Sequence, residues 1–120
     1  MMTATQLEDR MRGNLARART TLDEVGCKDW RLALDKRPTR RLGQTRYTQR
    51  TIGLTARLLA YNPWEVVEQV VLHEAAHALV GPGKAHGLEW QAMALKLGVR
   101  RPRRSTKAAT AAWEAEAMYG

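Results

Sequence analysis

The stretch that most limits how this chain can fold is a long apolar helix predicted to run from Pro63 to about Val80. Asn62 and Pro63 supply a cap and a proline at the first helical position, and Glu65 adds an acid to the first turn. The helix should stop at the Gly81-Pro82-Gly83 turn. Because valine and leucine occupy most of its sides, we expect it to be buried at the centre of the fold.

Two histidines and a glutamate lie within this buried helix. His73 and His77 are four residues apart, which puts both imidazoles on one face, and Glu74 is beside them. In this H-E-x-x-H arrangement the glutamate is placed to touch a metal-bound water rather than the metal. The Gly81-Pro82-Gly83 turn can fold the chain back and bring His86 to the same ion. Since a catalytic zinc needs three protein ligands and one open position, these histidines are the expected ligands.

A purely structural role for the histidines is the alternative to metal binding. The pair in the helix could hydrogen-bond inside the core, and His86 could be an exposed loop residue. Burying two imidazoles and a carboxylate without compensation is costly, whereas a divalent cation satisfies all of them. Cys27 is the single cysteine, so no cysteine pair can hold the ion, and Glu89 is the reserve ligand. The sequence therefore predicts one metal ion per chain.

The rest of the chain predicts an N-terminal helix, a small sheet and further helices. Thr5-Gln6-Leu7-Glu8 has the form of a capping box, and apolar residues then recur every three or four positions up to Gly26. Three short strands are predicted at residues 30–34, 42–48 and 51–54, joined as an antiparallel meander. The other predicted helices span residues 55–61, 88–97 and 108–118.

Charge predicts the kind of partner. The net charge is +8 and the pI is near 10.4, which favours polyanionic partners such as nucleic acid. Residues 28–57 hold nine basic residues against two acids, and residues 100–107 hold five and no acid. We expect DNA contact from these segments, although the same charge would also serve solubility. The arginines assigned to DNA are Arg37, Arg40, Arg41, Arg46, Arg100, Arg101, Arg103 and Arg104.

Length and hydropathy favour one domain in the cytosol. The 120 residues can bury a single core, and we expect one domain at residues 1–104 with a tail at 105–120. No apolar run approaches the roughly 20 residues of a membrane span, and the N-terminus lacks the pattern of a secretory signal. We therefore expect a cytoplasmic monomer without a membrane partner, in the bacterial cytosol or nucleoid, or encoded by a phage and acting there.

Two motifs carry a resemblance to a known family. HEAAHALV spans residues 73–80, and HGLEW follows at residues 86–90. Trp30, Arg41-Leu42-Gly43 and RTIGLTARLL upstream, with LGVRRPRR downstream, extend the likeness to roughly residues 30–104. Together they resemble the SprT-like zinc metalloproteases, which include the bacterial SprT proteins and the eukaryotic Spartan DNA-protein crosslink proteases.

The resemblance implies an α+β fold with a minimal zincin-like core, zinc bound by His73, His77 and His86, and Glu74 as the catalytic acid/base. Trp90 matches the aromatic residue after the third histidine, and we assign it to packing. The implied function is a zinc-dependent endopeptidase acting on DNA-associated or DNA-crosslinked proteins. Many relatives continue into a zinc ribbon or a DNA-binding module that this sequence lacks, so its own basic segments would have to contact DNA.

Some roles stay open at the level of sequence. Hydrolysis needs a group that stabilises an oxyanion, and four residues suit that role by type. Trp30, Trp64 or Tyr47 could stack on unpaired bases, but aromatic residues at core spacing usually belong to a core. The four candidates for the oxyanion are Tyr47, Tyr61, Arg46 and Tyr119.

Two other functions fit parts of the sequence. A regulatory protease of the IrrE type, which cleaves a repressor, would use a carboxylate as its third metal ligand. A basic nucleic-acid-binding protein could keep a structural zinc with little hydrolysis, but Glu74 argues against it, because a structural zinc needs no neighbouring base. A secreted or membrane protease is disfavoured by the missing signal and apolar segments.

Overall fold

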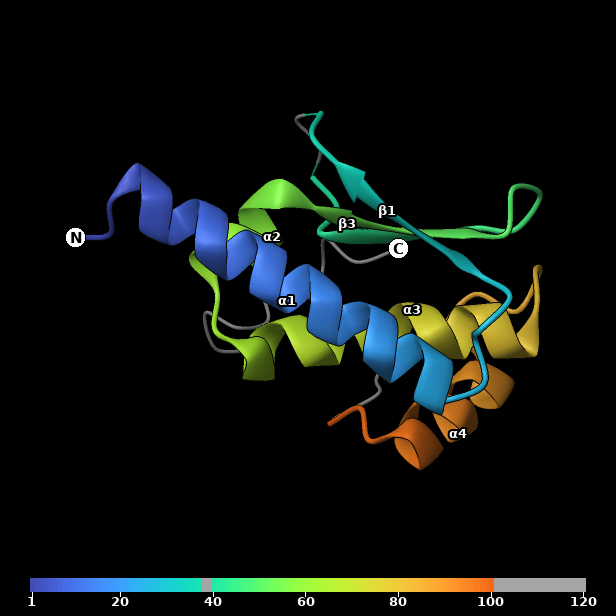
Figure 1. The fold of residues 1–120 in the computed structure, drawn as a ribbon. Coiled ribbons are helices and arrows are strands. Elements are labelled where there is room, and N and C mark those ends of the chain that lie inside the picture. The colour runs from blue at the N-terminus through green and yellow to red at the C-terminus, as the bar shows by residue number, and fades with distance from the viewer. Residues whose placement is uncertain (38–39, 101–120) are drawn as a thin grey trace.

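The computed structural model describes residues 1–37 and 40–100 of the chain, and their elements form layers (Figure 1). The elements are α1 Ala4–Glu24, β1 Arg31–Asp35, β2 Gly43–Arg46, β3 Thr51–Thr55, α2 Ala56–Tyr61, α3 Trp64–Val80 and α4 Leu88–Leu97. Helix α3 lies between the sheet and α4, and α1 packs across α2 and α3. Within these described residues, no helix is long and apolar enough to cross a membrane.

The sheet is mixed, so the prediction of an antiparallel meander is wrong. Its order is β1-β3-β2, with β3 antiparallel to β2 and parallel to β1. Leu32 and Leu34 of β1 lie opposite Ile52 and Leu54, which are the fully buried leucine and isoleucine of β3. Burial therefore places the most apolar strand in the centre, where it has a neighbour on each side, and leaves the more polar β2 at an edge.

The two faces of the sheet have different surroundings. Gly43 and Thr45 of β2 share the face of the buried β3 side chains, which is the face toward α3. On the opposite face, Arg46 forms an ion pair of 2.6 Å with Asp35. This pair passes over Gly53, where any side chain would collide with the Asp35 carboxylate. Alternation along β2 thus sends Gly43 and Thr45 toward the helix, and Gln44 and Arg46 away from it.

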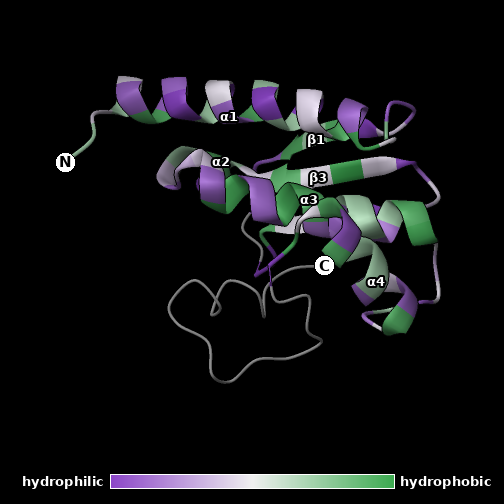
Figure 2. Ribbon diagram, turned by 90° about the horizontal axis from the view of Figure 1, so that it is seen from below, coloured by the Kyte–Doolittle hydropathy of each residue, from purple (hydrophilic) through white to green (hydrophobic). Residues whose placement is uncertain are grey.

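Helix α1 begins two residues earlier than predicted. Thr3 is the N-cap: its hydroxyl accepts from Gln6 N at 3.1 Å, and Gln6 Oε1 accepts from Thr3 N at 2.8 Å. The capping box therefore starts at Thr3 and not at Thr5. The expected apolar face is present and is turned toward the rest of the chain (Figure 2). Beyond the helix, Gly26 has a φ of 101°, which suits glycine at a reversal.

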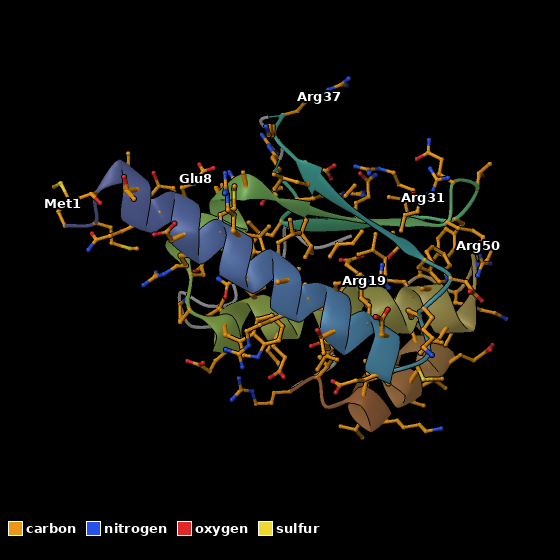
Figure 3. The ribbon with its side chains drawn as sticks, in the orientation of Figure 1. Met1, Glu8, Arg19, Arg31, Arg37 and Arg50 are labelled. Carbon is orange, nitrogen blue, oxygen red and sulfur yellow. The ribbon has the colours of Figure 1, made fainter. Side chains whose placement is uncertain are left out.

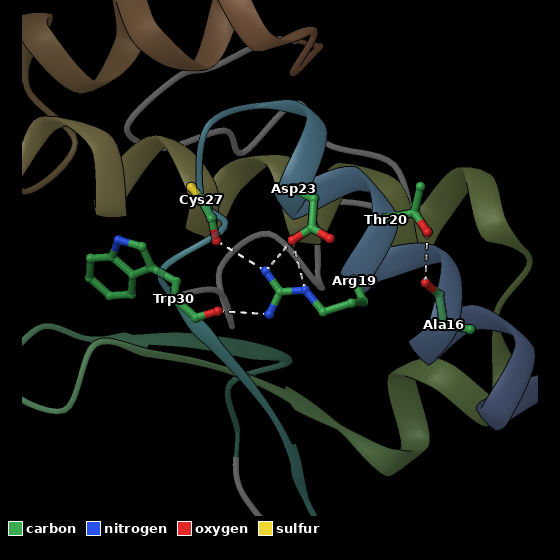
Figure 4. Close-up of polar contacts among 6 residues, drawn as sticks. All are labelled: Ala16, Arg19, Thr20, Asp23, Cys27 and Trp30. Carbon is green, nitrogen blue, oxygen red and sulfur yellow. Dashed lines mark hydrogen bonds and ion pairs between the residues drawn. The ribbon is translucent and has the colours of Figure 1, made fainter.

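Arg19 joins the end of α1 to the start of β1 (Figure 4). Its guanidinium donates to the main-chain oxygens of Trp30 at 2.7 Å and Cys27 at 3.0 Å. Two of its nitrogens also donate to Asp23 Oδ1, at 2.7 and 3.0 Å. Part of the positive charge of the chain is therefore used to hold the fold together.

Helix α4 keeps its predicted extent, whereas α3, which carries the H-E-x-x-H motif, begins one residue later than predicted. Helix α3 ends as expected, but its N-cap is Pro63, because the Asn62 side chain instead donates to Leu58 O in the last turn of α2, at 3.0 Å. Helix α4 closes at Gly98, which has the left-handed conformation typical of a helix end. The predicted terminal helix falls in residues 101–120, outside the described residues.

Candidate metal centre

Three histidine side chains meet where α3 faces the loop that precedes α4. His77 Nε2 lies 3.0 Å from His86 Nε2, and His86 Nε2 lies 3.2 Å from His73 Nε2. One ligand atom from each ring falls within 4.8 Å of the others, so the group can hold a metal ion. His73 and His77 are buried, and His86 is half-buried. The prediction that these three residues form one cluster is confirmed.

The separations of these nitrogens suit a single cation. Zinc binds imidazole nitrogen at about 2.0–2.1 Å, so two ligands of a tetrahedral ion lie about 3.3 Å apart. The observed 3.0 and 3.2 Å are close to that value. Unprotonated ring nitrogens that converge on one point repel each other through their lone pairs, and a cation between them removes that repulsion. The donor set thus fits a divalent metal, although imidazole ligands suit zinc, copper, iron and nickel alike.

The loop between α3 and α4 carries His86 back to the helix. Gly81 and Gly83 have φ values of 89° and 83°, which side chains rarely permit. Ala85, just before His86, has a φ of 47°, an uncommon conformation for alanine. Gln91 of α4 donates to the main-chain oxygen of His86 at 2.9 Å. The position of the third histidine is therefore set by two glycines, one left-handed residue and a contact from the next helix.

Trp90 packs directly against all three histidines. It is fully buried, and its ring stacks on His77 with 5.3 Å between centroids and 26° between planes. It meets the rings of His73 and His86 edge-on, each at 4.6 Å. The indole Nε1 also donates to the main-chain oxygen of His73 at 3.3 Å. Its burial confirms the assignment of Trp90 to packing.

Glu74 is fully buried beside the histidines, with Oε2 4.0 Å from His73 Nε2. The Thr45 hydroxyl donates to Glu74 Oε1 at 2.8 Å. Gly43 leaves the carboxylate its space, since an added Cβ would lie 3.1 Å from Glu74 Cγ and 3.3 Å from Oε2. Neither Gly43 nor Thr45 was predicted as a site residue. Their alternation in the sequence would have pointed to this helix only if the strand order had been known.

The reserve ligand Glu89 is not part of the cluster. Its carboxylate pairs with Lys84 at 3.1 Å, and both side chains are exposed. Among the described residues, the group able to hold a metal contains only histidine. This corrects the suggestion that Glu89 could complete the site.

A cleft of about 390 Å³ opens beside His77, between this histidine and β2. Tyr47, just after β2, is half-buried on its wall, and burial raises the pKa of its hydroxyl. The charge of Glu74 raises that pKa further, so the hydroxyl keeps its proton at neutral pH. The cleft is lined by Arg41, Thr45, Tyr47, His77, Gly83 and Ala85.

The arginines predicted to bind DNA have different surroundings. Arg37 is exposed and projects from the end of β1 (Figure 3), and Arg40 and Arg100 are exposed as well. Arg41 lines the cleft, whereas the charge of Arg46 is already compensated in its ion pair on the outer face of the sheet. The other three, Arg101, Arg103 and Arg104, lie outside the described residues.

The two tryptophans considered for base stacking are covered by arginines. Trp30 is buried, and the Arg50 guanidinium lies 5.0 Å from the centre of its ring. Trp64 is half-buried, with Arg17 at 4.6 Å. These contacts support the expectation that both rings serve packing.

Comparison with known proteins agrees with the geometry of the site. A sequence model of the SprT-like family matches residues 7–111, which is most of the chain. Comparison with curated proteins gives no match, and comparison with solved structures gives none either.

Proposed function

The chain belongs to the SprT-like family, and on that basis we propose that it is a zinc-dependent endopeptidase acting on DNA-associated or DNA-crosslinked proteins. The observation that carries this proposal is the fully buried Glu74 carboxylate next to three converging histidines. A purely structural metal needs no carboxylate beside it, and burying one is costly. A base for proton transfer beside the metal accounts for it.

The residues of the site divide the work of hydrolysis. His73, His77 and His86 would hold one zinc ion per chain. When bound, zinc supplies Lewis acidity, which polarises the scissile carbonyl and makes water a nucleophile near neutral pH. Glu74 accepts a proton from the attacking water and delivers it to the leaving amine. Thr45 keeps Glu74 oriented through its hydrogen bond to Oε1.

The basic surface supports the choice of DNA-associated proteins as substrates. Arg37, Arg40 and Arg100 are exposed, and Arg41 lies in the cleft itself. DNA held by these side chains brings proteins attached to it close to the histidines. Local concentration then replaces a deep specificity pocket.

The histidine cluster disfavours a repressor-cleaving protease of the IrrE type. That enzyme would need a carboxylate as the third ligand, whereas His86 occupies this place among the described residues. A nucleic-acid-binding protein with a structural zinc would use the same histidines, so cleavage itself has to separate it from a protease.

The test is cleavage of a DNA-binding protein crosslinked to an oligonucleotide, followed on gels with the zinc-loaded protein. We expect Glu74→Gln to keep its zinc and lose cleavage, because the amide cannot accept the proton. Glu65→Gln is the matched control, since Glu65 is exposed on the same helix, and it should cleave normally.

Zinc and tight DNA binding without cleavage would replace the proposal with a structural-zinc protein. Equal cleavage of free and DNA-bound protein would keep the peptidase and remove DNA from its function. A Glu74→Gln variant that loses its zinc would make Glu74 a structural residue.

A further inference from the structure

Peptide hydrolysis at this site requires one more group besides the metal ligands and the base Glu74. Attack of water on the carbonyl carbon leaves a negative charge on the carbonyl oxygen, and a positioned donor lowers the energy of that state. The inference below rests on the proposed function, because it concerns the same reaction. The donor must come from the cleft beside the histidines, since that is where the substrate carbonyl would lie.

The register of β2 excludes Arg46, one of the four candidates for the oxyanion donor. Side chains alternate along β2, so Gly43 and Thr45 lie on the face toward α3. Tyr47 follows in the turn just after the strand, where it packs against the core and lines the cleft. Arg46 is on the opposite face and is held there by its ion pair with Asp35. An arginine in that position cannot reach the histidines without breaking the pair.

The position of Tyr61 excludes it as well. It is the last residue of α2, 66% exposed, and it does not line the cleft. Tyr47 lines the cleft together with His77 and with Thr45, which binds Glu74. Among the described tyrosines, Tyr47 is therefore the one that shares a cavity with a metal ligand, His77, and with Thr45, the hydrogen-bond donor to the base.

The surroundings of Tyr47 suit a fixed hydrogen-bond donor. Its ring meets the buried Trp30 ring edge-on, with 6.2 Å between centroids. Its main-chain oxygen accepts from Arg50 N at 3.1 Å in the turn between β2 and β3. The side chain thus emerges from an anchored turn, and its hydroxyl remains protonated at neutral pH for the reasons given above.

We propose that Tyr47 is a catalytic residue whose hydroxyl donates a hydrogen bond to the oxyanion formed when water attacks the substrate carbonyl. The phenol keeps its proton throughout, and the proton removed from water still passes through Glu74 to the leaving amine. The hydroxyl of Tyr47 contributes little to binding of the substrate while the carbonyl is still uncharged. Its effect belongs to the transition state, and so to kcat rather than KM.

The experiment compares Tyr47→Phe, which removes only the hydroxyl, with wild type and with Tyr61→Phe as the matched control. We expect kcat to fall about a hundredfold in Tyr47→Phe, with KM and zinc content unchanged. A phosphonate peptide that mimics the tetrahedral state should bind Tyr47→Phe more weakly by a similar factor. Tyr61→Phe should match wild type in every measurement.

The outcomes separate this role from the proposed function. Wild-type kcat in Tyr47→Phe, in a protein that Glu74→Gln inactivates, overturns the role of Tyr47 and leaves the peptidase standing. A loss of kcat accompanied by loss of zinc makes Tyr47 structural and also overturns the role. If Arg41→Gln loses kcat and phosphonate affinity while Tyr47→Phe loses neither, the donor is Arg41. A wild-type protein that cleaves nothing overturns both proposals.

Discussion

The Thr45 hydroxyl donates a 2.8 Å hydrogen bond to Glu74 Oε1, and this contact joins the edge strand of the sheet to the helix that carries the metal motif. The same hydroxyl lies 3.0 Å from the main-chain oxygen of Glu74. The sheet therefore does more than cover the helix: it sets the orientation of the proposed base.

Thr45→Val should test that orientation. Valine has a similar shape and lacks the hydroxyl, so a buried carboxylate loses its donor, at a cost of about 1.5–3 kcal/mol. We expect kcat to fall at least tenfold while zinc content stays unchanged. Thr48→Val, at an exposed position in the following turn, is the control and should leave kcat unaltered. Full activity in Thr45→Val would show that Glu74 needs no help from the sheet.

Gly43→Ala should disturb both folding and activity. The added Cβ would come within 2.8 Å of Val70 Cγ1 and 3.1 Å of Glu74 Cγ, so β2 and α3 would have to separate. We expect a loss of about 1–3 kcal/mol in unfolding free energy, measured with urea, together with reduced cleavage. Gly13→Ala is a matched control, because its Cβ meets nothing within 4 Å in the exposed part of α1. It should add about 0.5–1 kcal/mol of stability.

Trp90→Ala should weaken the metal site through the packing of its ligands. Trp90 is fully buried against the three histidine rings, and such a truncation costs about 3–5 kcal/mol. We expect zinc affinity, measured by competition with a chelator, to fall together with stability. Leu88→Ala on the same helix is 83% exposed and should change neither. Unchanged zinc affinity in folded Trp90→Ala would mean that the rings hold their positions without the indole.

Cys27 should make stability depend on pH in the alkaline range. Burial raises the pKa of its thiol in the folded protein, and the charges of Arg19 and Arg50 offset only part of that effect. Folding thus favours the protonated thiol, so its contribution is complete below about pH 8.5, the ordinary thiol value, and is lost as pH rises above it. The difference in urea midpoint between wild type and Cys27→Ala should shrink from pH 7 to pH 10. A difference that stays constant over this range would contradict the raised pKa.

The helical part of the fold could be predicted because its signals are local. The extents of α3 and α4 follow from apolar periodicity ended by Gly81 and Gly98, and each stop lies next to the helix it ends. The strand order could not be predicted in this way. Whether β1 pairs with β2 or with β3 depends on which partner best covers Leu32 and Leu34, and that is decided by burial across the whole sheet.

In the site too, the residues with local sequence signals were predicted, and those placed by the strand order were missed. His73 and His77 could be paired from their helical spacing, and the glycine turn pointed to His86. Thr45 lies 29 residues from Glu74 in the sequence, and no local pattern joins the two. Its role became visible only with the register that places β2 at the edge of the sheet against α3.

The most direct test is the zinc content per chain, measured by elemental analysis on protein never exposed to chelator. Wild type, His86→Ala and Glu89→Gln should be compared in parallel. Three converging histidines predict one zinc in wild type and in Glu89→Gln, and its loss or marked weakening in His86→Ala. Folded wild-type protein without zinc, or His86→Ala that binds zinc as tightly as wild type, would contradict the three-histidine centre.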